Sequence, residues 1–454
     1  MKPLTPQKIA EVTGGKYIGD ESRKDDPIRG AVRDNRDVKP GNLFVCIQGE
    51  RVDGHTFANS AYDAGAGCCL AERELSEAKG PYVLVESTLE AFREIAEYYR
   101  SLFKIPFIGI TGSVGKTTGK EIIAAVLSST KNVLYTEKNL NNDIGVPLTL
   151  MALNEQHEAA VIEMGISDFG DMSILAKMVR PDIFVMTKIG YAHIDNLGSL
   201  EGVLKAKTEA FAYMKPEGIA VMNGDDDLLL NFDTKRKTIT FGLEAHNDYR
   251  AENVNSEGTN LIELDIATKI GSYPVKISTY GSHISAIAPA AAAVGSLLGL
   301  TDEEIAIGFE KYEPTEGRSF VSTKNEMTVI DDCYNANPNS VKAAITSLKA
   351  LPGRRVVILG DMLGLGEISE EMHREIGRFA AQCDIDELIC QGEQARFICE
   401  EYKSANGGIA HYYEDVNRLV SDISKYIKKG DTILLKASRG MRFEQLFPAI
   451  ACED

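Results

Sequence analysis

The stretch that decides the fold is Ile105-Pro106-Phe107-Ile108-Gly109-Ile110-Thr111-Gly112-Ser113-Val114-Gly115-Lys116-Thr117-Thr118. Its apolar half predicts a buried strand, and a helical pattern follows over residues 120–128. A glycine-rich loop between a strand and a helix binds phosphate, because backbone N–H groups and the helix dipole point at the anion. Lys116 would then reach the β- and γ-phosphates of a nucleotide, and the Thr117 hydroxyl would ligate Mg²⁺. The loop departs from the common phosphate-binding motif, whose first glycine would fall at Ile110.

The composition limits the class of protein. A chain of 454 residues is too long for one hydrophobic core, so two to four domains are expected. The formal net charge of −18 argues against non-specific binding to nucleic acid or to an anionic membrane, both of which need a basic surface. The eight cysteines contain no C-x-x-C pair, and no apolar leader follows Met1. A cytoplasmic protein with no membrane insertion is therefore expected.

Three α/β units are predicted along the chain. Residues 1–85 form a first small unit, and residues 86–104 form a helical linker whose cap is Ser87, with Glu90 three residues on. Residues 105–314 alternate strands and helices, which predicts a doubly wound, mostly parallel sheet. The predicted parallel strands are 107–111, 133–135, 159–164, 183–187 and 219–223, and runs 261–267 and 273–279 look antiparallel. Residues 315–454 alternate again and predict a second, Rossmann-like unit without a dinucleotide fingerprint.

Polar residues follow several of the central strands. In open α/β sheets ligands bind at the carboxyl ends of the strands, so Glu163, at the end of one strand, is a candidate Mg²⁺ ligand beside the phosphate loop. His193 follows the next predicted strand, and Lys205 and Lys207 lie on the helix beyond it. Taken alone, His193 is more often an ordinary hydrogen-bonded residue and the lysines a solvated face. A loop carrying Asn139, Asn141 and Asn142 is either a turn or a reader of sugar and carbonyl groups.

The last unit has its own polar strand ends. They are residues 331–338, which include Asp332 and Asn337, residues 360–362, and residues 436–442. Together with Arg318 in the preceding linker, these ends indicate a face that closes over a nucleotide. Ordinary loop chemistry at strand ends is the alternative for each one taken singly.

Taken together these motifs resemble the Mur ligase family, the ATP-dependent amide ligases that build the peptide of the peptidoglycan precursor. Thr111–Thr118 is similar to that family's shortened phosphate loop, and Asn139–Pro147 resembles its Asn-Asn-x-x-Gly-x-Pro motif. Glu163, His193 and Lys207 match its metal-site positions. The resemblance implies a carbamylated Lys207, which turns a cation into an anionic ligand.

Three stretches resemble the branch of the family that joins D-alanyl-D-alanine to UDP-N-acetylmuramoyl-tripeptide. Asp332–Ser340 is similar to its Asp-x-Tyr-Asn-Ala-Asn-Pro-x-Ser signature, Gly360–Gly366 to its Gly-Asp-Met-x-x-Leu-Gly, and residues 34–57 to its UDP-sugar domain. The resemblance implies an acyl-phosphate mechanism with ATP and two Mg²⁺ ions, small-molecule substrates and a monomer. The first domain would bind the UDP-substrate, the second ATP, and the third the incoming dipeptide while it closes over ATP.

The implied site residues fall into four groups. The catalytic residues are Lys116, Glu163, His193 and Lys207. The ATP contacts are Thr111, Gly112, Ser113, Val114, Gly115, Lys116, Thr117, Thr118, His283, Arg318, Asp332 and Asn337. The substrate contacts are Asn35, Arg36, Asp53, Gly54, His55, Asn139, Asn141, Asn142, Tyr334, Asn335, Lys436 and Ser438. The metal ligands are Thr117, Glu163, His193 and carbamylated Lys207.

Two positions depart from the family pattern, and two alternatives remain. The family's His-Asn-x-x-Asn run keeps only His283, with Ile287 in place of the adenine-side Asn, and Asn35 replaces a serine on the uridine side. One alternative is a neighbouring ligase, diamino-acid adding or folate polyglutamate adding. The former would carry an Asp-Asn-Pro-Arg motif, and the latter lacks a UDP-sugar domain. The other alternative is a nucleotide-binding switch without ligase activity, which would not need both His193 and Lys207.

Overall fold

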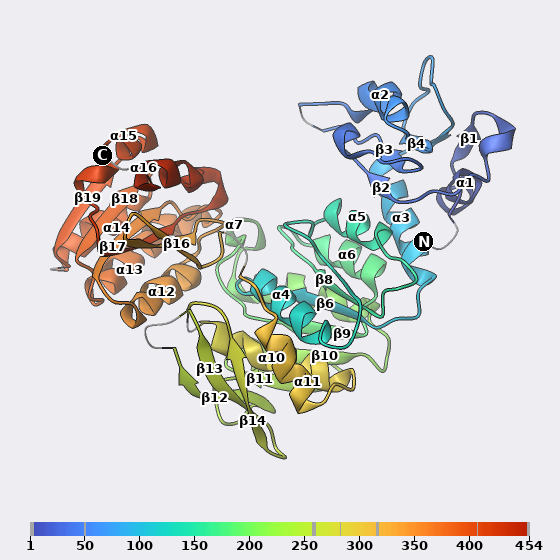
Figure 1. The fold of residues 1–454 in the computed structure, drawn as a ribbon. Helices are drawn as coiled ribbons and strands as arrows, with labels where there is room; N and C mark the ends of the chain where they lie inside the picture. Colours follow the sequence, from blue (N-terminus) through green and yellow to red (C-terminus); the bar gives the residue numbers. More distant parts are fainter. Residues whose placement is uncertain are drawn as a thin grey trace.

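The computed structural model describes residues 4–49, 51–256, 260–281, 283–314, 317–405 and 407–451, apart from the side chains of His283 and Ala451. Three α/β domains follow one another along the chain and surround a concave face (Figure 1). Within the described residues they are built on sheets of five, nine and six strands. The predicted fold class is confirmed by this arrangement. No helix in the described part is both long and apolar enough to cross a bilayer.

The N-terminal domain holds the five-stranded sheet, with its strands in the order β1-β5-β4-β3-β2. Its elements are α1 (Pro6–Thr13), β1 (Lys16–Ile18), β2 (Ala31–Val32), β3 (Leu43–Val45), α2 (Ala58–Asp63), β4 (Cys68–Ala71), β5 (Tyr82–Leu84) and α3 (Thr88–Ser101). The Ser87 side chain accepts the Glu90 N–H, which confirms the predicted helix cap. Two side chains of α3 donate hydrogen bonds to backbone carbonyls of the central domain. Tyr99 donates to the Leu153 carbonyl at 2.9 Å, and Arg100 donates to the Val179 carbonyl at 2.7 Å. Helix α3 therefore anchors the first domain on the second.

The central sheet has the strand order β14-β13-β12-β11-β10-β9-β6-β8-β7. Its strands are β6 (Phe107–Thr111), β7 (Val133–Tyr135), β8 (Ala159–Glu163), β9 (Ile183–Met186), β10 (Ile219–Asn223), β11 (Lys237–Gly242), β12 (Tyr249–Asn255), β13 (Ile262–Ala267) and β14 (Ser272–Ile277). Strands β6 to β12 are parallel to one another, and β13 pairs antiparallel with both β12 and β14. The predicted central strands are confirmed, whereas β11 and β12 lie in a stretch for which no strand was expected.

Helices cover both faces of the central sheet because its parallel strands are apolar on both sides. One apolar cluster joins the sheet to α4 (Lys116–Leu127), α10 (His283–Leu297) and α11 (Asp302–Glu310). The cluster on the opposite face joins it to α3, α5 (Gly145–Met151), α6 (Asp171–Val179) and α8 (Leu200–Thr208). Helix α4 begins at Lys116, four residues earlier than its apolar periodicity indicates, because the polar Lys-Thr-Thr run forms its first turn.

The C-terminal sheet has the order β15-β16-β20-β17-β18-β19, with only β15 antiparallel in the part that the structure describes. The strands of this sheet are β15 (Phe320–Lys324), β16 (Met327–Asp332), β17 (Arg354–Gly360), β18 (Glu387–Gln391), β19 (Ile409–Tyr413) and β20 (Asp431–Lys436). The helices of the domain are α12 (Pro338–Ser347), α13 (Ser369–Ala381), α14 (Ala395–Ser404), α15 (Val416–Asp422) and α16 (Phe447–Ala451). Strands β15 and β19 and helix α14 were not expected from the sequence.

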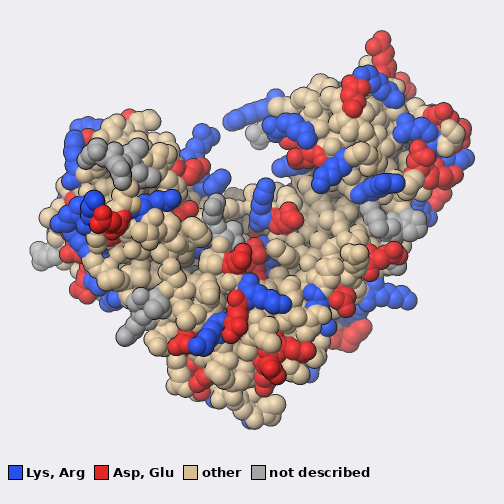
Figure 2. Space-filling view, viewed as in Figure 1, with Lys and Arg blue, Asp and Glu red and all other residues tan. Residues whose placement is uncertain are grey.

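The C-terminal domain meets the central domain at α7 (Ile194–Leu197) (Figure 1). Ile194 is buried in the apolar cluster of the C-terminal domain, and so is Tyr280 of the central domain. A hollow lies above this junction, between the first and third domains, and Lys and Arg side chains gather on its rim (Figure 2). A local basic rim of this kind can attract an anionic substrate even though the whole chain is acidic.

Candidate active site

The phosphate loop is held rigidly between β6 and α4. Gly112 has φ +152°, and a Cβ there would lie 1.9 Å from the Thr187 hydroxyl oxygen, so only glycine fits. Gly115 starts α4 with φ +81°. The Ser113 N–H donates to the Lys188 carbonyl at 2.7 Å, which fixes the loop against the end of β9. The first N–H groups of α4 are thereby left for an anion.

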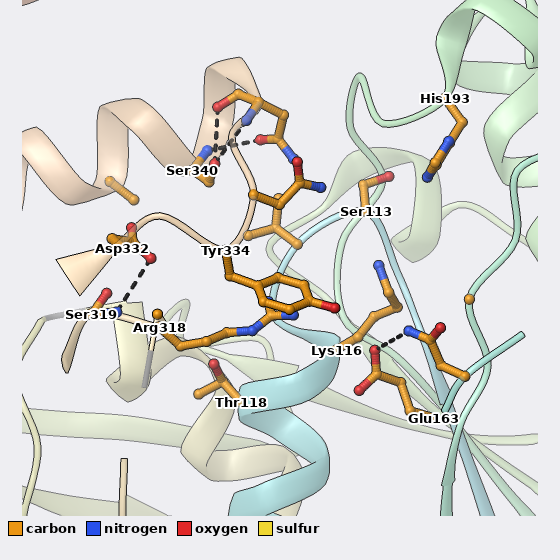
Figure 3. Close-up of a pocket in the computed structure, with 18 of the residues that line it drawn as sticks. Ser113, Lys116, Thr118, Glu163, His193, Arg318, Ser319, Asp332, Tyr334 and Ser340 are labelled. Carbon is orange, nitrogen blue, oxygen red and sulfur yellow. Dashed lines mark hydrogen bonds between the residues drawn. The ribbon is translucent and has the colours of Figure 1, made fainter. Parts of the chain in front are cut away.

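The loop forms one wall of a cavity of about 370 Å³ between the central and C-terminal domains (Figure 3). The cavity is lined by Ser113, Val114, Gly115, Lys116, Thr118, Asn141, Asn142, Glu163, Gly165, Ile166, Ser167, His193, Gly317, Arg318, Ser319, Asp332, Tyr334, Asn335, Asn337, Ser340, Ala343, Ala344 and Lys436. Sequence-predicted residues from two domains thus meet in one place. The carboxyl ends of parallel strands from both domains supply them, as expected for open α/β sheets.

Lys116 and Glu163 form the charged floor of the cavity. Lys116 donates to the Gly112 carbonyl at 2.8 Å, and in Figure 3 its ammonium group points into the space between Glu163 and His193. Burial lowers the pKa of Lys116, while the negative charge of Glu163 opposes that shift. Phosphate oxygens at this position would restore a favourable environment for the buried cation.

Glu163 has the features of a metal ligand. Its side chain is almost completely buried, and its Oε1 accepts from the Asn141 amide at 2.8 Å. Its Oε2 is also buried and has no hydrogen-bond partner among the described residues. A buried carboxylate oxygen without a partner is costly unless a cation binds it. The donor set around the loop therefore fits a hard divalent cation such as Mg²⁺.

His193 and Lys207 lie on consecutive helices beside this floor. His193 precedes α7 in the left-handed region, with φ +58°, and lines the cavity. Lys207 is buried in α8. Burial lowers the pKa of Lys207 well below its ordinary value, and the charge of Lys116 lowers it further. Desolvation, followed by the charges of Lys116 and Lys207, lowers the pKa of His193. Both side chains are therefore driven toward their neutral forms.

Two threonines that the motif places in contact with ATP, Thr111 and Thr117, do not line the described cavity wall. Thr118 contributes to the cavity wall, whereas Thr117, the predicted Mg²⁺ ligand, is buried and is not among the described lining residues. Thr111 is buried too, and its hydroxyl donates to the Met164 carbonyl at 2.7 Å. The hydroxyl of Thr111 therefore serves the fold.

The C-terminal wall combines one ion pair with one stacked pair. Lys436 Nζ lies 2.6 Å from Asp332 Oδ2, across neighbouring strands β16 and β20. The Arg318 guanidinium lies 4.0 Å from the centre of the Tyr334 ring, a distance at which cation and ring attract one another. Asn337 caps α12 by accepting the Ser340 N–H at 2.9 Å, so its amide NH₂ remains for a ligand. These side chains present a carboxylate, an aromatic face and amide donors, which suit a nucleoside.

Several predicted contacts lie outside the cavity. In the N-terminal domain, His55 is buried between the Asp53 carboxylate, 2.6 Å from Nδ1, and the Glu72 N–H, 3.0 Å from Nε2. A Cβ on Gly54 would lie 2.7 Å from the Ile47 carbonyl oxygen, so this motif shapes a tight turn. Asn35 and Arg36 are within reach of solvent in a short helical turn, where Arg36 pairs with Asp34.

Some of the remaining predicted contact residues are open to solvent or line the cavity, and others are bonded within the fold. Asn139 is exposed, and Asn142 accepts the N–H of Gly145, the first residue of α5, at 2.9 Å. Ser438 is buried and accepts the Leu363 N–H at 2.9 Å. The side chain of His283 and linker residues 315–316 lie outside what the structure describes.

Ile287 explains one departure from the family motif. It is buried in the apolar cluster beneath the sheet, and a Cβ added at Gly119 of α4 would lie 3.2 Å from its side chain. An asparagine there would place an amide in that apolar contact. The isoleucine thus contributes to packing between α10 and α4.

Sequence reasoning missed some of the lining residues. Ser167, Ser319 and Ser340 contribute hydroxyl groups to the cavity wall. Ser340 is the last residue of the Asp332–Ser340 motif, but Ser167 and Ser319 lie in loops without a distinctive pattern. Short polar residues in loops are common everywhere, so only the folded arrangement marks these as wall residues.

Comparisons with known proteins agree along the chain. Residues 28–100 match the description "Mur ligase family, catalytic domain", residues 110–295 "Mur ligase middle domain" and residues 317–439 "Mur ligase, glutamate ligase domain". The chain is 35% identical over 456 residues to UDP-N-acetylmuramoyl-tripeptide–D-alanyl-D-alanine ligase of Bacillus subtilis, covering 97% of each chain. It is 36% identical over 459 residues to the enzyme of the same name from Escherichia coli, covering 99% of each.

Solved structures give the same picture. Crystal structure I of MurF from Acinetobacter baumannii superposes with a TM-score of 0.88 at 29% identity, covering 99% of both chains. MurF ligase from Thermotoga maritima in complex with ADP superposes with a TM-score of 0.82 at 30% identity, covering 93% of this chain and 97% of that one.

Proposed function

This chain belongs to the Mur ligase family, and we propose that it joins D-alanyl-D-alanine to UDP-N-acetylmuramoyl-tripeptide at the expense of ATP, in peptidoglycan precursor synthesis. The observation that carries this proposal is the cavity that unites a phosphate loop, the Glu163 carboxylate and the nucleoside-type wall of the C-terminal domain. The relatives that carry this activity by name match the chain over nearly its whole length.

The reaction proceeds in two steps. The terminal carboxylate of the tripeptide attacks the γ-phosphorus of ATP, the bond to the bridging oxygen breaks, and ADP and an acyl phosphate form. The amine of D-alanyl-D-alanine then attacks the acyl carbon, loses a proton, and phosphate leaves. Both steps bring negative groups together, so catalysis depends on positioning and on electrostatic stabilisation. Lys116 stabilises the transferred phosphoryl group, and the loop N–H groups orient it.

The cavity fits Mg²⁺ through residues already described. Glu163 Oε2 and His193 would supply an oxygen and an imidazole ligand, and we assign two ions to the site. The Thr117 hydroxyl would be a further ligand only after a rearrangement of the loop, because it is buried away from the described cavity wall. Bound Mg²⁺ neutralises phosphate charge and polarises the reacting phosphoryl group. Among the described residues no cluster of three His, Cys, Asp or Glu side chains forms a metal site by itself, so further ligands are needed.

Lys207 supplies one of those ligands after carbamylation. Burial holds the pKa of its amine well below the ordinary value, which favours the neutral form that is nucleophilic toward carbon dioxide. The amine nitrogen attacks the carbon of CO₂ and a proton is released, which leaves a carbamate anion. The carbamate would also place a negative charge near the Lys116 ammonium, whose positive charge disfavours a protonated Lys207.

Residues of all three domains would hold the reacting complex. We propose that Asp332 contacts the ribose of ATP, with Arg318 and Asn337 beside the nucleotide. We propose that the substrates are contacted by Asn35, Arg36, Asp53, Asn139, Asn141, Asn142, Tyr334, Asn335 and Lys436. Gly54, His55 and Ser438 are left out, because their groups are used within the fold. We further propose that the enzyme is a monomer, that it acts in the cytoplasm, and that its substrates are small molecules.

The proposed function predicts that phosphate release from ATP requires both UDP-N-acetylmuramoyl-tripeptide and D-alanyl-D-alanine. A coupled assay of inorganic phosphate, with each substrate omitted in turn, measures this. Omission of either one is expected to reduce the rate to the background without enzyme, because no stable product forms from one alone. Rapid phosphate release with neither substrate present would instead support a nucleotide switch.

A further inference from the structure

Lys120 is a fully buried lysine that the proposed reaction does not use. It lies on α4, one helical turn after Lys116, and its side chain has no exposed surface. A buried ammonium group is costly unless it is paired and hydrogen-bonded. Its Nζ lies 2.6 Å from Glu121 Oε1 and donates to the Thr136 carbonyl at 2.5 Å. The second of these contacts reaches the end of strand β7.

Thr136 connects Lys120 to the backbone of Glu163. Its hydroxyl oxygen accepts the Glu163 N–H at 3.0 Å, and its own N–H donates to the Val161 carbonyl at 3.1 Å. Thr136 is completely buried. Thr136 therefore extends the pairing of β7 with β8 to the end of β8, and Lys120 links that threonine to α4.

The same segment contacts Glu163 a second time. Five residues after Thr136, Asn141 donates to Glu163 Oε1 at 2.8 Å, and its carbonyl accepts the Gly165 N–H at 2.8 Å. Residues 136–141 thus bind Glu163 at its N–H and at its carboxylate. What remains is Oε2, which has no hydrogen-bond partner among the described residues and belongs to the cavity-lining Glu163.

We propose that Lys120 is a positioning residue: acting through Thr136, it fixes Glu163 relative to the phosphate loop, so that Oε2 meets the Mg²⁺ of the nucleotide. This inference rests on the proposed function and deepens it. One helix then carries both Lys116, which contacts phosphate, and Lys120, which sets the distance from that phosphate to the carboxylate. Partners that orient a metal ligand commonly contribute 10- to 100-fold to metal affinity.

The test compares Thr136→Val with Thr136→Ser. Valine keeps the shape but removes the acceptor for the Glu163 N–H, whereas serine keeps it. The probe is ADP, whose dissociation constant is measured by calorimetry with saturating Mg²⁺ and without it. Thr136→Val is expected to lose about 10-fold or more of the Mg²⁺-dependent gain in ADP affinity. Its affinity for ADP without Mg²⁺ should stay within about 2-fold, because the phosphate loop is intact.

Lys120→Met tests the other end of the chain of contacts, with Lys311→Met as the matched control. Lys311 also donates to a carbonyl, that of Ser128 at 3.2 Å, at the far end of α4. Lys120→Met should lose the Mg²⁺-dependent gain, and Lys311→Met and Thr136→Ser should keep it. If Lys120→Met does not fold, the Thr136 variants still test the contact through which Lys120 is proposed to act, because both keep the backbone carbonyl that accepts from Lys120 and only Thr136→Val loses the acceptor for the Glu163 N–H. An unchanged gain in Thr136→Val would then reject the inference.

Two results would overturn the inference. One is an unchanged Mg²⁺-dependent gain in Thr136→Val. The other is an equal loss of ADP affinity with and without Mg²⁺, which would indicate a role in stability only. Because the probe is ADP binding, the outcome does not depend on ligase turnover. A failure of the ligase assay combined with a loss of the Mg²⁺-dependent gain would reject the proposed function and retain the role of Lys120.

Discussion

Replacing Lys207 by alanine is expected to reduce kcat on the order of 10²- to 10³-fold, the usual result of removing one electrostatic group that acts on the transition state. Lys207 is buried, and burial together with the charge of Lys116 holds its pKa well below the ordinary value. Burial disfavours the charged form of this amine, so an unmodified Lys207 would bring little charge to the phosphate site. Its carbamate would supply the negative charge, and alanine cannot form one.

Chemical rescue separates this role from a loss of packing. A short-chain carboxylic acid such as acetate can enter the space left by Lys207→Ala and supply the missing carboxylate oxygens. Partial recovery of kcat with increasing acetate is therefore expected. Lys205→Ala is the matched control, since Lys205 is exposed on the same helix and stands 5.8 Å from the Phe169 ring centre. Full activity of Lys207→Ala would remove this residue from the metal site.

Replacing Glu163 by glutamine is expected to lower the kcat of Mg²⁺-dependent turnover on the order of 10²- to 10³-fold. Glutamine has the same size, and its carbonyl can still accept from Asn141, so the substitution removes mainly the charge. The buried Oε2, which lacks a partner in the described structure, is the atom whose charge is lost. Steady-state rates over a range of Mg²⁺ concentrations measure the effect.

The thermal stability of Glu163→Gln tests the same assignment without measuring turnover. A buried carboxylate oxygen without a partner costs free energy in the absence of metal, so the melting temperature of Glu163→Gln without Mg²⁺ is expected not to fall. Glu158→Gln is the control, because Glu158 lies just before the other end of β8 and its carboxylate accepts the Asn132 N–H at 2.9 Å. Turnover of Glu163→Gln at the normal rate would exclude this carboxylate from the site.

The local part of this site was predictable because its signals are local. A strand, a glycine loop and a lysine at a helix start occupy consecutive residues, and the structure has them as predicted. The apolar runs of the central strands were equally clear, since parallel strands are apolar on both faces. Strands β11 and β12 escaped notice because both include exposed, polar positions that dilute the pattern.

Contacts between distant residues could not be derived in this way. Lys436 and Asp332 are 104 residues apart in sequence and form an ion pair only because β16 and β20 are neighbours. Lys120 resembles any solvated helix lysine until its burial is known. The opposite error occurred at His55. Its place in a motif suggests ligand binding, but in the structure both of its ring nitrogens are bonded within the domain, to the Asp53 carboxylate and to the Glu72 N–H. Such assignments depend on tertiary structure, which periodicity does not report.

The central claim is that this cavity activates a carboxylate as an acyl phosphate. It is tested most directly by labelling the terminal carboxylate of UDP-N-acetylmuramoyl-tripeptide with ¹⁸O and following the label by mass spectrometry. One labelled oxygen is expected in the released inorganic phosphate for each amide bond formed, because the attacking carboxylate oxygen leaves with the phosphoryl group. Phosphate released without ¹⁸O while the amide product accumulates would contradict the account.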